Sequence, residues 1–183
     1  MSVTENPMAA DITGMPAEER ILVVGIGNVL MLDEGLGCRV VEELQAGYEF
    51  PDNVDVIDSG TMGMLMLNLF RNYDFILVVD AVDGTGYEPG TVVRMAPEDI
   101  APNQVMHSLH DMRFIDVLEA ADMIGVRPQG HVVGVQVADM NPVELTIGLS
   151  EPVEAALETA IDAVLTVLRE RGVDVNAVGE SAD

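Results

Sequence analysis

Hydrophobic residues occur along this chain in two alternating patterns, short apolar runs and longer stretches at helical spacing. The short runs cover residues 21–24, 54–57, 75–79 and 131–137. Runs of this length are typical of strands in a parallel sheet, where both faces are covered. Apolar residues at helical spacing follow over residues 36–44, 64–70, 112–124 and 151–171. The alternation predicts an α/β fold with an open, mostly parallel sheet.

Residues 91–95 depart from this alternation, because no helical pattern precedes them. We expect an antiparallel edge strand there. The length of 183 residues suits one domain with a full hydrophobic core. We expect residues 1–19 to be a disordered lead-in, residues 20–175 to form the domain, and residues 176–183 to be a flexible tail. Ser150 is the predicted cap of the last helix.

The first predicted strand and the loop after it combine glycines with acids. Gly25 and Gly27 interrupt the apolar run, and Asp33 and Glu34 stand directly before the next helical pattern. A dinucleotide-binding fingerprint requires a third glycine where this chain has Leu30, and acids repel a pyrophosphate, so the loop does not match that motif. The acids suit a tight turn at the positive end of a helix. They also stand at the carboxyl end of a strand, where ligands bind in open α/β sheets.

Charge and composition exclude several classes of function. The formal net charge is −24, which opposes binding to nucleic acid and to anionic membrane surfaces. All eight basic residues are arginines, so the chain lacks a P-loop lysine, a Schiff-base lysine and a phospho-receiver lysine. No apolar run approaches a membrane span, and the N-terminal residues lack the apolar core of a signal peptide. We therefore expect a soluble, cytoplasmic protein.

Acidic side chains stand at the ends of three predicted strands. Glu34 follows the first strand, Asp58 the second, and Asp80 comes directly after the apolar run 75–79. His110 lies at the start of a predicted helix, which we expect near the same sheet edge. Two carboxylates and an imidazole form a metal-ligand set with positions open for a further ligand.

Simpler interpretations of these residues stay open. Asp58 could hold its own turn, and His107 and His110 could be surface histidines. His131 begins a strand and therefore belongs to the opposite, amino-terminal edge. Cys38 is the single cysteine, and we expect a packed core thiol, because no histidine or cationic partner is apparent nearby.

The chain resembles the maturation endopeptidases of nickel–iron hydrogenases. The matching pieces are GIGNVLMLDEGLG, DSGTMGM, VVDAVD, HDMRFIDVL and IGLSEPVEAAL, which together cover about residues 20–170. An acid, a DxGT turn, a second acid and a histidine follow one another in the same order as in the family. We do not expect chance to produce this order. The resemblance implies a three-layer α/β/α sandwich around a mixed, mostly parallel five-stranded sheet.

The resemblance also implies which residues contact metal. The D-E pair assigns Glu34, the strand VVDAVD assigns Asp80, and HDMRFIDVL assigns His110. His107 has no counterpart in the family and is a reserve ligand. The family's DGGT-type turn maps to residues 58–61, with serine in the second position.

The activity implied by the resemblance is that of an unusual peptidase, of aspartic type and dependent on nickel for recognition. The family trims the C-terminal tail of the hydrogenase large-subunit precursor, and its metal site reads nickel already inserted in that substrate. We therefore expect nickel to be carried by the precursor rather than held permanently by the enzyme. Asp58 is the candidate catalytic residue, bordering the same crevice and aiding the attack of water.

Two other functions stay open on the residues alone. A free-standing metal-dependent hydrolase or aminopeptidase would use the carboxylates and a histidine to bind zinc and activate water. A receiver-like signalling domain would explain acids at strand ends, but it would lack the lysine that such domains use.

Overall fold

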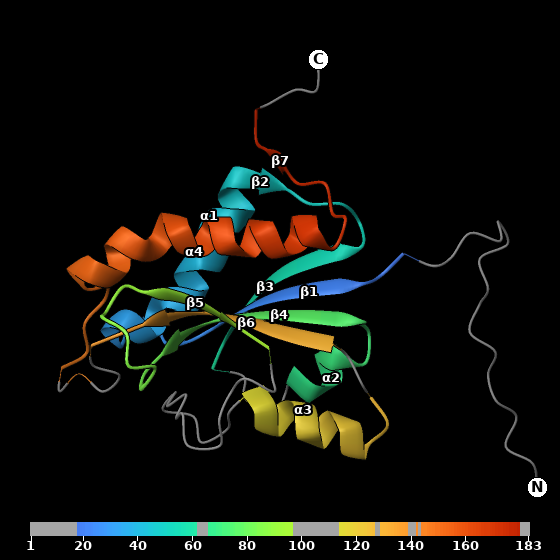
Figure 1. Ribbon diagram of the computed structural model, residues 1–183, viewed down its shortest axis with the longest axis horizontal. Coiled ribbons are helices and arrows are strands. Elements are labelled where there is room, and N and C mark those ends of the chain that lie inside the picture. The colour runs from blue at the N-terminus through green and yellow to red at the C-terminus, as the bar shows by residue number, and fades with distance from the viewer. Residues whose placement is uncertain are drawn as a thin grey trace, which may run out of the picture.

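Five strands form one sheet that separates two layers of helices (Figure 1). The computed structural model describes residues 18–61, 66–96, 114–126, 129–138, 142 and 144–179. The strands of the sheet are β1 (Ile21–Ile26), β3 (Val54–Gly60), β4 (Phe75–Val82), β5 (Val92–Met95) and β6 (Gln129–Gln136). Their spatial order is β3-β1-β4-β6-β5, and only β5 is antiparallel to its neighbour. The predicted mixed sheet and its antiparallel edge strand are confirmed.

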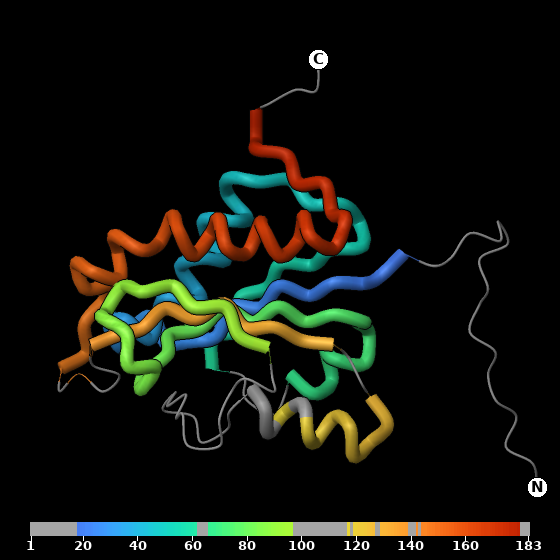
Figure 2. Tube along the Cα trace, in the orientation of Figure 1, coloured from blue at the N-terminus to red at the C-terminus, as the bar shows by residue number. Residues whose placement is uncertain are grey.

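Helices cover both faces of the sheet (Figures 1 and 2). The helices on one face are α1 (Leu36–Gly47) and α4 (Glu151–Glu170). Those on the other are α2 (Met66–Phe70) and α3 (Phe114–Met123). A short 3-10 helix, η1 (Leu32–Gly35), leads directly into α1. The three-layer α/β/α sandwich is therefore confirmed.

The central strand β4 contributes to both hydrophobic cores, because alternate side chains of a strand point to opposite faces. Phe75, Leu77 and Val79 pack in the core with α1 and α4. Ile76, Val78 and Val82 pack in the core with α2 and α3. All eight residues of β4 are buried, which explains its continuous apolar run.

Two strands continue beyond the apolar runs that predict them. β4 extends to Val82 because its neighbour β6 pairs with it as far as Gln136. β3 likewise extends to Gly60, which pairs with the end of β1. Asp80 and Asp58 therefore lie inside strands rather than directly after them, and the pleat decides which face each carboxylate points to.

Residues near both ends of the described domain form contacts with other parts of the fold. The two-residue strands β2 (Tyr48–Glu49) and β7 (Asn176–Ala177) pair antiparallel, so the first two residues of the predicted flexible tail are in a small sheet. Of the predicted lead-in over residues 1–19, only the last two residues lie within the described part, and Glu19 forms an ion pair with Arg171. Among the described helices, none is long and apolar enough to cross a bilayer.

Candidate active site

Two glycines let η1 and α1 pack directly against strand β1. A Cβ atom on Gly25 would overlap the carbonyl oxygen of Gly37 in α1. One on Gly27, whose φ is +148°, would overlap the carbonyl oxygen of Glu34. That same carbonyl accepts the Asn28 N–H at 3.1 Å. Gly25 and Gly27 therefore allow the backbones to pack closely, and this packing fixes the position of Glu34.

The loop that carries Glu34 is held from its other side by the segment before α4. The Leu32 N–H donates to the Thr146 carbonyl at 2.7 Å. The Ser150 N–H and hydroxyl donate to the two oxygens of the buried Asp33 carboxylate, at 2.7 and 2.8 Å. Leu32 has a φ of +51°, a left-handed conformation that costs a non-glycine residue about 1–2 kcal/mol. Contacts on both sides hold this strained loop in place.

Ser150 occupies the predicted N-cap position of α4, but its side chain does not cap the helix. The hydroxyl donates to Asp33 instead of accepting a helix N–H. Ser150, the N-cap residue of α4, thus helps to hold the loop that carries Glu34.

Glu34 and Asp80 form a pair of buried carboxyl groups at the carboxyl edge of the sheet. Their exposed fractions are 2% and 5%. Burial, the largest cause, raises the pKa of Asp80 well above its usual value; the hydrogen bond from the Ala81 N–H opposes this, and the charge of Glu34 raises the pKa further. Because two buried carboxylates repel each other, the pair favours a proton or a cation between them.

Asp58 lies at the same edge of the sheet, but on the opposite face. The pleat of β3 places Asp58 on the α1 side, together with Val54 and Val56. The pleat of β4 places Asp80 on the side of α2 and α3, together with Val78. The structure therefore brings Glu34 and Asp80 together, whereas Asp58 points to the other face of the sheet, and the charges of both Asp58 and Asp80 raise the pKa of the Cys38 thiol.

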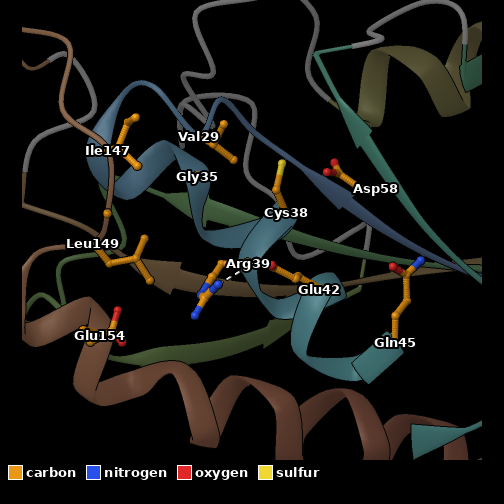
Figure 3. A pocket seen from close by; sticks show the side chains of 11 residues that line it. Val29, Gly35, Cys38, Arg39, Glu42, Gln45, Asp58, Ile147, Leu149 and Glu154 are labelled. Carbon is orange, nitrogen blue, oxygen red and sulfur yellow. Dashed lines mark hydrogen bonds and ion pairs between the residues drawn. The ribbon is translucent and has the colours of Figure 1, made fainter. Parts of the chain in front are cut away.

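Asp58 lines a cavity of about 430 Å³ between α1, β3 and the segment before α4 (Figure 3). Its Oδ1 accepts the Gly60 N–H at 2.8 Å, so the carboxylate does hold its own turn. The buried Cys38 also lines this cavity, and its thiol lies 3.5 Å from the Gly27 carbonyl. Burial, and then a hydrogen bond to Asp58, raise the pKa of the Cys38 thiol to about 12. A thiol with this pKa is not a nucleophile at neutral pH, and the predicted buried position of Cys38 is confirmed.

Two buried polar residues that the sequence pattern does not single out also support this edge. Ser59 donates its hydroxyl hydrogen to the Gly25 carbonyl at 2.9 Å and joins β3 to β1. Gln136 accepts the Thr85 N–H at 3.1 Å and donates to Asp83 at 3.1 Å, so it fixes the loop after β4. A single polar residue at the end of an apolar strand is the signal that could have identified Gln136.

Of the three histidines in the sequence, the structure describes His131. His107 and His110 lie outside the described residues. His131 lies on β6 toward the amino-terminal edge, as the sequence predicts. Its ring centroid is 5.6 Å from that of Phe75. Within the described residues, no three His, Cys, Asp or Glu side chains are grouped to hold a metal ion. Glu34 and Asp80 are the described members of the predicted ligand set.

The fold matches those of solved α/β endopeptidases. The Escherichia coli hydrogenase-maturating endopeptidase HybD matches with a TM-score of 0.74 at 37% identity, over 88% of this chain and 99% of that one. The hydrogenase 2 maturation peptidase of a Thaumarchaeota archaeon matches with a TM-score of 0.61 at 34% identity, over 82% of this chain and 99% of that one.

The chain belongs to the hydrogenase maturation protease family. The model of that family matches residues 38–167. The hydrogenase 2 maturation protease of Escherichia coli K12 is 38% identical over 159 residues, which are 85% of this chain and 94% of the relative. The hydrogenase expression/formation protein HupD of Rhizobium leguminosarum is 39% identical over 173 residues, 92% of this chain and 84% of the relative. The family resemblance carried by the sequence motifs is confirmed.

Proposed function

We propose that this protein removes the C-terminal extension from the large-subunit precursor of a nickel–iron hydrogenase, and that it acts after nickel has been inserted. Membership of the hydrogenase maturation protease family supports the peptidase activity. The observation that carries the nickel-dependent part is the buried carboxyl pair Glu34 and Asp80. A cation presented at this pair would relieve their repulsion, which gives the enzyme a reason to bind a metal-loaded precursor more tightly than an empty one.

The third proposed metal contact is His110, and the position of α3 supports it. Val117 and Ala121 of α3 pack in the same core as Val78, on the sheet face that carries Asp80. Because α3 leads into β6, its C-terminal end lies toward the amino-terminal edge and its N-terminal end toward the carboxyl edge (Figure 1). His110 precedes the first residue of α3 by four positions, a reach of about 13 Å.

In this proposal the nickel arrives with the substrate. Glu34, Asp80 and His110 would supply part of its coordination shell, and the softer thiolates of the precursor would supply the rest. The metal-stripped protease should therefore bind free nickel weakly. Its selectivity for loaded precursor would come from the two carboxylates and the imidazole together.

Asp58 is the proposed residue that aids the attack of water on the scissile bond. β1 lies between β3 and β4, so the Cα atoms of Asp58 and Asp80 are about two strand spacings, roughly 10 Å, apart at the same edge of the sheet. An extended peptide covers that distance with about three residues. The metal site and the cleaved bond would thus contact neighbouring parts of one precursor segment. Asp58→Asn keeps the size of the side chain, and we expect it to lower kcat while the affinity for precursor persists.

The decisive experiment is incubation of the metal-stripped protease with nickel-loaded and nickel-free precursor, with tail release followed by mass spectrometry. We expect cleavage of the loaded precursor only. Glu34→Gln and His110→Ala should remain folded and lose at least about a hundredfold in rate, whereas Glu158→Gln on the exposed side of α4 should not. Equal cleavage of both precursors would refute nickel recognition. Tight stoichiometric zinc with hydrolysis of unrelated peptides would identify a free-standing metallohydrolase instead.

A further inference from the structure

The extended segment before α4 has one backbone edge that is paired and one that forms no hydrogen bond to the part of the chain that the structure describes. Thr146 forms an isolated parallel bridge with Met31, in which its N–H donates to the Leu30 carbonyl at 2.9 Å and its carbonyl accepts the Leu32 N–H. Successive residues of an extended chain direct their backbone groups to opposite edges. The N–H and C=O groups of Leu145 and Ile147 therefore point away from residues 30–32. No hydrogen bond within the described part of the chain uses them.

The side chains beside this open edge form an exposed apolar surface. Leu145 and Ile147 are 75% and 79% exposed, and Val29 and Leu30, across the bridge, are 50% and 45% exposed. We call these four residues the apolar lip. Exposed large hydrophobic side chains that gather in one place mark a binding surface rather than an ordinary solvated one.

The apolar lip borders the cavity that contains Asp58. Val29 and Ile147 line this cavity together with Asp58 (Figure 3). Among the described residues, its charged lining consists of three carboxylates and one guanidinium, from Asp58, Glu42, Glu154 and Arg39. Arg39 is already engaged by Glu42 at 2.6 Å and by Glu43 at 3.0 Å. The cavity therefore complements a ligand with a basic group.

We propose that residues 145–147 are a docking strand for the precursor, on which the segment around the cleaved bond adds as an extended β-strand. The main chain of that segment bonds the outward N–H and C=O groups of Leu145 and Ile147. Its apolar side chains pack on the apolar lip, and a basic side chain enters the acidic cavity toward Asp58. This inference rests on the proposed peptidase function and specifies its substrate as an extended segment with apolar residues and one basic residue.

Two substitutions test the docking strand without disturbing the bridge. Ile147→Pro removes one outward N–H, and the extended Thr146 before it already has the conformation that a following proline requires. Leu145→Asp replaces an exposed apolar side chain with a charge. Val178→Asp is the matched control, because Val178 is 57% exposed and follows β7, away from the cavity.

The primary measurement is the affinity of each full-length variant for nickel-loaded precursor, determined by surface plasmon resonance at low temperature. We expect Ile147→Pro to raise Kd about fivefold, as for one lost hydrogen bond, and Leu145→Asp to raise it about tenfold. Val178→Asp should bind like the wild type. Circular dichroism of each variant confirms that it is folded.

Several outcomes separate this inference from the proposed function. Binding that weakens in both variants, without cleavage by the wild type, would support the docking strand and refute the peptidase role proposed for this precursor. Cleavage by the wild type with unchanged Kd in both variants would overturn the docking strand alone. A wild-type protein that fails to bind the precursor would overturn both. A concentration-dependent dimer in sedimentation that Leu145→Asp dissociates would assign the open edge to a second copy of the chain, and would also overturn the docking strand.

Discussion

The carboxylate of Asp33 accepts both the backbone N–H and the hydroxyl of Ser150, a contact between residues 117 positions apart. Ser150→Ala removes only the hydroxyl bond, and we expect it to lower the free energy of unfolding by about 1 kcal/mol. Asp33→Ala leaves the N–H and the hydroxyl without their acceptor, and we expect a loss of about 2–3 kcal/mol. The double variant should lose less than the sum, because both changes act on one contact. Urea unfolding measures all three, and strictly additive losses would contradict the coupling.

Asp80→Asn should stabilise the metal-free protease while it abolishes processing. The pKa of Asp80 is raised in the folded state, chiefly by burial, so folding is favoured while this carboxyl group is protonated. That contribution is complete below the usual pKa and is lost as pH rises through the folded-state pKa. Asparagine does not ionise, so the advantage of the variant in Tm should be small near pH 4 and grow toward pH 8.

For a domain of this size, each kcal/mol gained corresponds to about 2–4 °C in Tm. The control for Asp80→Asn is Asp162→Asn, on an exposed position of α4, which should change neither Tm nor its pH dependence. A lower Tm for Asp80→Asn than for the wild type at pH 8 would contradict this explanation. If Asp80→Asn is more stable than the wild type and inactive, the Asp80 carboxylate is needed for function and not for folding.

Cys38 should resist alkylation in the folded protein. A rise of its pKa from 9.0 to about 12 lowers the thiolate fraction near neutral pH by about a thousandfold. Iodoacetamide should therefore label the native protein very slowly and the urea-unfolded protein rapidly, as followed by mass spectrometry. Asp58→Asn removes a negative charge that raises the pKa of the thiol and replaces a carboxylate acceptor with a weaker amide one, so Cys38 should be labelled faster in this variant than in the wild type. Equal labelling of native and unfolded wild type would refute the protected thiol.

Gly27→Ala should cost far more stability than a glycine substitution in open space. The new methyl group would overlap the Glu34 carbonyl oxygen, and the φ of +148° adds backbone strain. We expect a loss above about 3 kcal/mol and loss of processing. Gly172→Ala is the matched control: it has a φ of +78° with no atom near the new Cβ, and should cost about 1 kcal/mol. Equal Tm values for the two variants would show that close packing at Glu34 is not what requires Gly27.

The sequence alone determines the order of the elements and the class of fold. The apolar run before Asp80 and the helical spacing after Glu34 are local patterns, because strand and helix periodicity depends on residues only a few positions apart. The motifs that carry the family resemblance are equally local. The antiparallel strand β5 follows from the lack of a helical pattern between it and β4.

Tertiary structure alone decides which carboxylates meet. Asp58 and Asp80 both follow apolar runs, and nothing local distinguishes them, but pairing with neighbouring strands extends β3 and β4 past both residues. Once each acid lies inside a pleated strand, the strand's register selects its face, and the two acids point to opposite sides of the sheet. The contact of Asp33 with Ser150 and the open edge at Ile147 likewise depend on segments that only folding brings together, so no local pattern records them.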